Sequence, residues 1–381
     1  MTTKLVALVA AHNEEASIRA TLLSLLRQDR RADRIVVAVD NCTDATLAIA
    51  QSVPGVTVFE TEGNRAKKPG ALNQAWLRYC GDADLIVCVD ADTILERDAF
   101  GGWEREFADD DRLGGCSAKF TMLVDDSMTF SQRLLVRLQR AEFAKWTDLS
   151  LRRGRTSVLA GTACCLRNSA LRGIADRRRR SGEGWGPWIE TSLVEDFELT
   201  YRMRELGWRS KVSTTVRAYT DAMTDLRSLW AQRMKWQTGT VEDLLRFGVN
   251  PLTRFDWWQQ LQGMLAVAIR VAWIVLLVAG AVMGTLQLQP LWLIPPALFL
   301  ANDVKQSFRI PHRTAADVLV AALLVPQELF AFMRAGWFLM AWSRVLDEKV
   351  VGIQQRDRWA LQAEAEVRRR AAGASMAATR S

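Results

Sequence analysis

The segment LIVCVDADT, residues 85–93, is a run of apolar and β-branched side chains that ends in two aspartates, Asp90 and Asp92. Such a run predicts a strand buried on both faces, as in a parallel sheet. Open α/β sheets bind ligands at the carboxyl ends of their strands, which is where these two carboxylates stand. Spaced two residues apart, they can share one Mg²⁺ or Mn²⁺ ion, because both cations prefer oxygen ligands and leave positions for phosphate oxygens. A solvated turn is the alternative interpretation of this Asp-x-Asp pattern.

Apolar runs predict three further strands before this segment, at residues 4–11, 35–39 and 56–60. A helical spacing of apolar residues follows each strand, and this alternation with short connections predicts a doubly wound parallel sheet. Polar residues stand where the strands end: Asn13 and Glu14 after the first, and Asp40 after the second. Because such ends meet at one edge of a sheet, we expect these side chains to lie near Asp90 and Asp92.

The composition narrows the chemistry. The chain has 381 residues, a net charge of +7 and only two histidines, His12 and His312. Two histidines provide few ligands for a zinc site and few bases to activate a nucleophile. We therefore expect carboxylates to carry out any catalysis. The six cysteines show no CxxC spacing, which favours a reduced cytosolic domain. The mild basic excess suits phosphate-bearing substrates or an anionic membrane surface and is too diffuse to indicate nucleic-acid binding.

Four motifs carry a family resemblance: AAHNEE (residues 10–15), VVAVDNCTD (36–44), KKPGALNQA (67–75) and VDADT (89–93). The set resembles the nucleotide-sugar-binding half of family 2 inverting glycosyltransferases of the GT-A fold, in the membrane-bound group of cellulose, chitin and hyaluronan synthases. The resemblance implies a mixed α/β sheet with helices on both faces, followed by C-terminal membrane helices. It also implies a nucleotide-sugar donor, most simply a UDP-sugar, and a bound Mg²⁺ or Mn²⁺.

The resemblance assigns roles to single residues. The uracil and ribose of the donor would be cradled by four residues: Ala11, Asn13, Glu14 and Asp40. Lys68 would lie beside the diphosphate, and Asp92, together with Asp90, would hold the metal, with Asp90 also near the nucleotide or the sugar. A diphosphate leaving group needs its charge neutralised, which a metal ion and a lysine can do.

Beyond the fourth motif, the pattern predicts a strand at residues 115–122, a long amphipathic helix at 128–151 and a strand at 159–167. Gly161 and Thr162 in the last strand permit close approach of backbone to substrate, and this segment is similar to the acceptor segment of processive synthases. An ordinary glycine-containing strand is the alternative. The arginines and glycines of residues 177–188 predict a basic surface loop, which could instead close over substrate or touch lipid phosphates.

A helix predicted from residue 194 to about 207 begins with Glu195 and Asp196. This pair resembles the Glu-Asp pair of the family, whose second residue deprotonates the acceptor hydroxyl. The resemblance therefore implies that Asp196 is the general base, with Glu195 beside it. Capping of the helix N-terminus is a competing explanation for the acidic residues, and both can hold at once.

The residues QRMKW, 232–236, lie on a helix predicted at 226–247 and resemble the Gln-x-x-Arg-Trp signature of the synthases. In the family these residues contact the donor diphosphate, and the tryptophan stacks under the acceptor sugar. The resemblance implies that Gln232, Arg233, Lys235 and Trp236 lie at the donor and Trp236 at the acceptor. Lys235 departs from the signature, because it keeps the charge but not the planar fork of arginine. Arg233 could supply the missing guanidinium, and the departure bears on processivity more than on transfer.

Three apolar stretches predict membrane segments, at residues 261–286, 291–301 and 318–342. The first is long enough to span a bilayer. The third carries ionisable residues, so we expect a broken helix or a re-entrant hairpin there. Basic flanks predict cytoplasmic ends and two or four crossings. The expected parts are a cytosolic GT-A domain at residues 1–250, interfacial and transmembrane helices at 251–345, and a basic, partly disordered cytosolic tail at 346–381.

The favoured hypothesis is a multi-pass cell-membrane glycosyltransferase with its catalytic domain on the cytoplasmic face, acting in polysaccharide biosynthesis or a related transfer. It would move a hexosyl or N-acetylhexosaminyl group to a glycan, lipid or protein hydroxyl, either processively or one sugar at a time. Two to four membrane crossings would form only a narrow conduit for a polymer, and a homo-oligomer could provide a wider one. The alternative is a non-catalytic nucleotide-sugar-binding membrane scaffold or sensor, but such a protein would not need a base at Asp196. A nucleotidyltransferase would need a glycine-rich N-terminal loop, which the sequence lacks.

Overall fold

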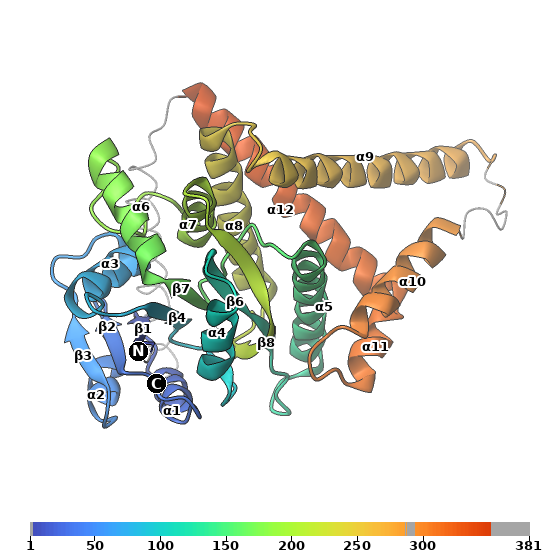
Figure 1. The fold of residues 1–381 in the computed structure, drawn as a ribbon. Coiled ribbons are helices and arrows are strands. Elements are labelled where there is room, and N and C mark those ends of the chain that lie inside the picture. Colours follow the sequence, from blue (N-terminus) through green and yellow to red (C-terminus); the bar gives the residue numbers. More distant parts are fainter. Residues whose placement is uncertain (1–2, 286, 288–293, 352–381) are drawn as a thin grey trace, which may run out of the picture.

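The computed structural model describes residues 3–285, 287 and 294–351. An eight-stranded mixed sheet organises its N-terminal part, with the strand order β3-β2-β1-β4-β7-β6-β8-β5 (Figure 1). The strands are β1 (Leu5–Ala11), β2 (Arg34–Val39), β3 (Thr57–Glu60), β4 (Leu85–Asp90), β5 (Ile94–Leu95), β6 (Leu113–Met122), β7 (Ala163–Arg167) and β8 (Arg209–Thr220).

The strands β1 to β4 are parallel to one another and form one half of the sheet. In this half the alternation of side chains along β1 feeds two separate cores. Leu5, Ala7 and Val9 pack in one core with residues of α1 (Ile18–Leu26) and α4 (Ala99–Ala108). Val6 and Leu8 pack in the other core with α3 (Lys67–Tyr79), α6 (Asn168–Ser181) and α7 (Glu195–Glu205). The predicted mixed α/β sheet with helices on both faces is therefore confirmed.

The second half of the sheet makes it mixed. β7 runs antiparallel to both β4 and β6, whereas β8 is parallel to β6 and antiparallel to the short β5. As a result, β8 ends at the same edge as β1, β2 and β4. The strand-and-helix alternation alone predicted only parallel strands, and it holds for β1 to β4.

Several predicted elements differ from those observed. The strand predicted at residues 159–167 covers only Ala163–Arg167, so Gly161 and Thr162 lie in the turn before it. Residues 177–181 were expected in a basic loop but form the last turn of α6, because Arg178 is buried there with Glu198. The predictions omitted α4, β5 and β8. Two other helices are close to expectation, α5 (Phe130–Arg153) and α8 (Leu226–Phe247), and α2 (Thr46–Gln51) follows β2 as expected.

The C-terminal helices first extend away from the α/β part of the chain and then return to the helices α5 and α8. α9 (Arg254–Val282) extends away from the rest of the chain, and α12 (Leu324–Val351) comes back to lie along α8 (Figure 1). Where α12 contacts α8, Leu229 and Trp337 are buried, and a Cβ at Gly336 would lie 2.8 Å from the ring of Trp230. In the sequence, α10 (Ile294–Ser307) and α11 (Ala315–Ala321) lie between α9 and α12.

Among the described residues, α9 is the one helix long and apolar enough by itself to cross a membrane, and the pair α11 and α12 becomes a second candidate if it is counted as one span bent by 71°. The predicted break in the third apolar stretch is therefore present. Residues 288–293, where the second predicted segment begins, and the tail from residue 352 lie outside the described residues.

Candidate active site

The residues predicted to hold the nucleotide base meet at the ends of β1 and β2. Asp40 is buried, and its Oδ1 accepts hydrogen bonds from Asn41, Thr61 and Asn64 at 2.9, 2.6 and 2.8 Å. Its backbone amide donates to the carbonyl of Ala11 at 2.8 Å. These three donors hold the carboxylate in one orientation through Oδ1, which leaves Oδ2 available to accept from a ligand.

The turn after β1 is fastened to the turn after β2. Asn13 has a φ of 57°, and its Oδ1 accepts from the amide of Thr43 at 2.8 Å. The amide of Glu14 donates to Thr46 Oγ1 at 2.7 Å. Burial raises the pKa of Glu14, and the nearby charge of Asp92 adds to the effect. The structure thus gathers Ala11, Asn13, Glu14 and Asp40 at one edge of the sheet, as the sequence predicted.

Lys68 lies at the centre of a second group. It lies in the first turn of α3, and its Nζ forms an ion pair with Asp90 and lies 3.9 Å from Glu195. Burial by itself would lower the pKa of Lys68, but the charges of Asp90 and Glu195 outweigh it and raise the pKa above its usual value. The ammonium therefore stays charged, and it holds together residues that are far apart in the sequence.

Gly161 and Thr162 form the turn that closes this group. The Thr162 carbonyl accepts from the amide of Asp90 at 3.0 Å, and the Gly161 carbonyl accepts from Lys68 Nζ at 3.3 Å. A Cβ at Gly161 would lie 2.7 Å from Nζ, so a side chain there would displace the lysine. The requirement for glycine is therefore steric.

Asp196 faces the same turn from the start of α7. Its Oδ2 accepts from the amide of Gly161 at 3.3 Å, and its Oδ1 accepts from the amide of Phe197 at 2.8 Å. Burial, assisted by the charge of Glu195, raises the pKa of Asp196 to about 6. A carboxylate with a pKa near 6 is ionised at neutral pH and is a stronger base than an ordinary aspartate, which suits general base catalysis.

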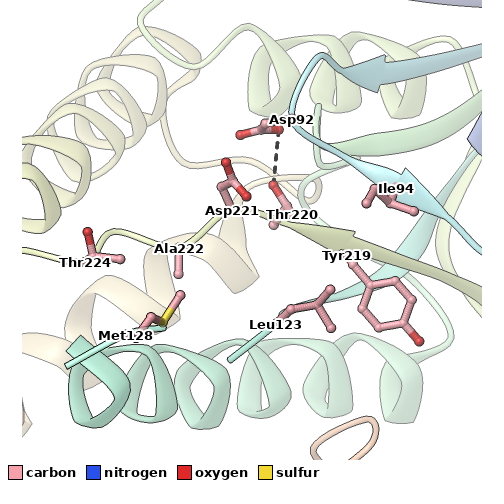
Figure 2. A pocket seen from close by; sticks show the side chains of 9 residues that line it. All are labelled: Asp92, Ile94, Leu123, Met128, Tyr219, Thr220, Asp221, Ala222 and Thr224. Carbon is pink, nitrogen blue, oxygen red and sulfur yellow. Dashed lines mark hydrogen bonds between the residues drawn. The ribbon is translucent and has the colours of Figure 1, made fainter. Parts of the chain in front are cut away.

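Asp92 opens onto a cavity of about 340 Å³ beside this group. Figure 2 shows its carboxylate near that of Asp221, with Thr220 Oγ1 donating to Asp92 Oδ1 at 3.3 Å. Burial raises the pKa of both aspartates, and for Asp92 the charge of Asp221 contributes as well. The remaining lining residues are Ile94, Leu123, Met128, Tyr219, Ala222 and Thr224.

The sequence analysis did not identify Asp221. It directly follows β8, so the rule that polar residues at strand ends form the site would have selected it. β8 was not predicted because its sequence, RSKVSTTVRAYT, lacks the continuous apolar run of β1 and β4.

The QRMKW motif on α8 is held by α5. Arg233 is buried and donates through Nε and Nη2 to Glu142 Oε2 at 3.1 and 2.8 Å, and through Nη1 to Gln232 Oε1 at 2.7 Å. Its guanidinium also lies over the ring of Trp236, 4.5 Å from the centroid. Lys235 is exposed. Arg233 therefore contacts α5 and its own motif, and the structure does not bring it to Lys68.

Trp236 belongs to a group of aromatic side chains where α5 and α8 meet. Its ring centroid lies 6.1 Å from that of Phe143 and 6.5 Å from that of Trp146, which is nearly half exposed. It also packs against the cluster that contains Val194 and Phe197, the neighbours of the Glu195-Asp196 pair. Trp236 is thus placed close to the backbone that carries the candidate base.

The carboxylates offer only part of a metal site. Within the described ranges, three or more His, Cys, Asp or Glu side chains do not gather in an arrangement that could hold a metal ion. Asp90 is committed to Lys68, while Asp92 and Asp221 face the cavity. Oxygen donors of this kind suit Mg²⁺ or Mn²⁺, provided that phosphate oxygens and water complete the coordination.

Comparison with known proteins identifies the family. Residues 3–239 match the family described as "Glycosyltransferase like family 2". This chain belongs to that family. It is 24% identical over 246 residues to the poly-beta-1,6-N-acetyl-D-glucosamine synthase of Staphylococcus aureus strain COL, covering 63% of this chain and 55% of that protein. It is 27% identical over 258 residues to the probable glycosyltransferase YdaM of Bacillus subtilis strain 168, covering 64% and 57% of the two chains.

A solved structure supports the fold. The mannosyltransferase PcManGT from Pyrobaculum calidifontis, in complex with GDP-Man and Mn²⁺, matches with a TM-score of 0.52 and 19% identity over 86% of this chain and 87% of that one. At this identity the match concerns the fold alone. The alignments with the two curated relatives span only about half the length of those proteins.

Proposed function

We propose that this chain is an inverting glycosyltransferase that takes a sugar from a nucleotide-sugar donor and works at a membrane. The observation that carries this proposal is the group in which Lys68 contacts Asp90 and Glu195 while Asp196 lies against Gly161. It places a permanent positive charge, for a diphosphate, next to a carboxylate that can accept a proton.

The reaction follows from these two groups. Asp196 removes the proton of the acceptor hydroxyl as the hydroxyl oxygen attacks the anomeric carbon of the donor. The bond from that carbon to the diphosphate oxygen breaks, and its electron pair leaves with the nucleoside diphosphate. Lys68 stabilises the charge that develops on the departing diphosphate. Attack from the face opposite the leaving group inverts the anomeric configuration.

Donor binding is assigned to the base pocket and to Asp92. Asp40 Oδ2 can accept from N3–H of uracil or from N1–H of guanine. Mg²⁺ or Mn²⁺, when bound, would neutralise charge on the diphosphate, and the residues suited to hold it are Asp92 with Asp221 or Asp90. The names of the relatives rank the donors to test, with an N-acetylglucosaminyl donor first and GDP-mannose second.

The membrane assignment rests on α9. Its most apolar window has a mean hydropathy of 2.5, and none of that window is buried within the chain. An apolar helix of 29 residues that contacts α12 at a few positions, among them Arg270 with Glu328 at 3.1 Å, but leaves its most apolar window exposed is more stable in a bilayer than in water. α9 leaves the catalytic part, while α11 and α12 pack against α5 and α8, so both ends of the proposed membrane region lie at the catalytic part, which we place on the cytoplasmic face.

Release of nucleoside diphosphate by the detergent-purified full chain tests the proposal. UDP-, GDP- and dTDP-sugars are each supplied with Mg²⁺ or Mn²⁺ and with mono- and oligosaccharide acceptors. We expect turnover of one donor, loss of turnover in Asp196→Asn, and unchanged turnover in the control Asp111→Asn, which alters an exposed aspartate. Donor binding in both wild type and Asp196→Asn, with no turnover in either, would instead support a nucleotide-sugar-binding scaffold or sensor.

Product size decides between polymerisation and single transfer. The signature arginine is replaced by the exposed Lys235, and Arg233 is engaged with Glu142, so the planar guanidinium fork is not available at this position. This favours transfer of one or a few sugars to an acceptor over long processive synthesis. Mass spectrometry of the products, made with acceptor in excess and then limiting, distinguishes the two.

A further inference from the structure

Positive charge gathers where α9 leaves the catalytic part. α5 ends at Arg153, Arg155 follows in the loop, and Arg254 begins α9. We call these three arginines the basic collar. Arg155 and Arg254 are exposed, and the Arg153 guanidinium lies over the ring of Phe255, 3.1 Å from its centroid. This stacking holds Arg153 at the first turn of α9.

The three collar arginines carry more positive charge than the carboxylate beside them can neutralise. Asp256 is the carboxylate that acts on Arg153, and it is shared with the largely buried Arg204, whose Nη2 lies 3.8 Å from Asp256 Oδ2. Burial and the repulsion from Arg155 lower the pKa of Arg153 to about 10. Within the described part of the chain, no carboxylate lies in ion-pair distance of any collar arginine.

The opposite side of the same junction is neutralised. Lys145 pairs with Asp303 at 2.6 Å, Arg309 pairs with Asp148, and Arg140 lies 3.4 Å from Asp317. Those pairs join α5 to α10 and α11. The basic residues there are thus neutralised in ion pairs, whereas the collar arginines, among the described residues, are not.

The collar lies at the depth expected for lipid headgroups. Trp257 and Trp258 lie in the first turns of α9, separated from Arg254 by Phe255 and Asp256, and the ring of Trp257 lies 6.2 Å from that of Trp342 on α12. Exposed apolar side chains begin one turn further along α9, with Leu261 and Leu265 each more than half exposed. Aromatic rings between a charged layer and an apolar layer mark the membrane interface.

We propose that the basic collar binds the phosphate of an anionic phospholipid and thereby fixes the tilt of the catalytic part against the bilayer. The inference rests on the proposed membrane attachment through α9. Guanidinium groups match phosphate with paired donors, and the collar has three of them without a protein carboxylate in ion-pair distance. Trp146 lies on α5, the helix that ends with Arg153 of the collar, and its ring lies 6.5 Å from that of Trp236 on α8, so a bound lipid would hold the proposed acceptor region near the membrane surface.

The test compares lipids in detergent solution. The full chain is titrated with dioctanoyl phosphatidylglycerol, with dioctanoyl phosphatidylcholine and with inorganic phosphate, and the thermal midpoint is followed by tryptophan fluorescence. The collar variant Arg153→Gln/Arg155→Gln/Arg254→Gln is matched by Arg19→Gln/Arg31→Gln/Arg97→Gln, which removes the same charge from the far side of the sheet. Each basic residue near an anionic surface contributes about fivefold in affinity, so we expect the collar variant to bind phosphatidylglycerol on the order of 100-fold more weakly.

The outcomes separate the inference from the proposed function. Stabilisation by phosphatidylglycerol, but not by phosphatidylcholine, that is lost only in the collar variant supports the collar. Equal stabilisation by both lipids, or equal loss in the matched variant, overturns it, as does an effect of inorganic phosphate as large as that of the lipid. Turnover of the donor in lipid-free detergent is unaffected by these results, whereas a full chain that stays soluble without detergent would overturn the membrane attachment itself.

Discussion

Replacing Asp196 by asparagine should abolish transfer and at the same time make the protein more stable. The folded environment raises the pKa of this carboxyl from 3.8 to about 6, and at 1.36 kcal/mol per unit the ionised form costs about 3 kcal/mol on folding. Asparagine carries no charge but keeps only one good acceptor, so one of the bonds from Gly161 and Phe197 is weakened at a cost of about 1 kcal/mol. The net gain is about 2 kcal/mol at pH 8.

The raised pKa of Asp196 also determines how the free energy of unfolding changes with pH. Between pH 3.8 and about 6 the folded protein keeps the proton on Asp196 while the unfolded chain has lost it. The stability of the wild type therefore falls as the pH rises through this window and is constant above it. The advantage of Asp196→Asn should be about 2 kcal/mol smaller at pH 4.5 than at pH 8.

Thermal unfolding in detergent at the two pH values measures the effect. For a domain of this size about 1 kcal/mol moves the midpoint by roughly 2–4 °C, so the variant should melt roughly 4–8 °C higher at pH 8 and close to the wild type at pH 4.5. Asp111→Asn serves as the control and should show no pH-dependent difference. A midpoint gain of the same size at both pH values would refute the electrostatic reasoning, and a variant that retains transfer would refute the assignment of the base.

Four further predictions follow from the site. The pH–rate profile of the wild type should fall on the acid side with an apparent pKa near 6, because Asp196 must be ionised to accept a proton; a profile that is flat down to pH 5 would contradict this. Gly161→Ala should lower kcat by at least tenfold with normal folding by circular dichroism, because its Cβ would displace Lys68, whereas Gly81→Ala, where the space is open, should be neutral. Asp221→Asn should raise the concentration of Mn²⁺ needed for half-maximal activity, measured by metal titration; an unchanged requirement would remove Asp221 from the metal site. Glu142→Leu should destabilise the protein by about 3 kcal/mol, because it leaves Arg233 buried and unpaired, and chemical unfolding of this variant beside Arg233→Met/Glu142→Leu should show most of the loss recovered in the double variant.

The parts of the fold that could be predicted are those in which one local rule decides the outcome. β1, β2 and β4 are buried on both faces, so their sequences are continuous apolar runs, and the polar residues that follow them stand at the site edge. α8 has the ends predicted for it, and local residues mark both of them: Asp225 caps its start and Gly248 follows its last residue.

The parts that could not be predicted depend on distant partners. Arg178 resembles a solvated loop residue in the sequence, yet Glu198, twenty positions later, pairs with it in the interior. β8 has few apolar residues in succession, and its place is decided by pairing with β6 over eight registered positions. Asp221 therefore escaped the analysis, although it obeys the same rule as Asp40 and Asp92. The partner of Arg233 was likewise not predictable, because Glu142 lies ninety-one positions earlier and local spacing does not reveal it.

The return of α12 to α8 changes how the chain must be made. Leu229 and Trp230 of α8 belong to the catalytic part, but their cover, Phe330 and Trp337, is synthesised only after α9 and α10. The segment formed by α9 and α10 is thus an insertion within a domain rather than an appendage to it. On the proposed membrane attachment, the contact of α12 with α8 closes only after α9 has entered the bilayer, so a chain whose α9 stays outside the bilayer would leave the apolar contact face of α8 exposed.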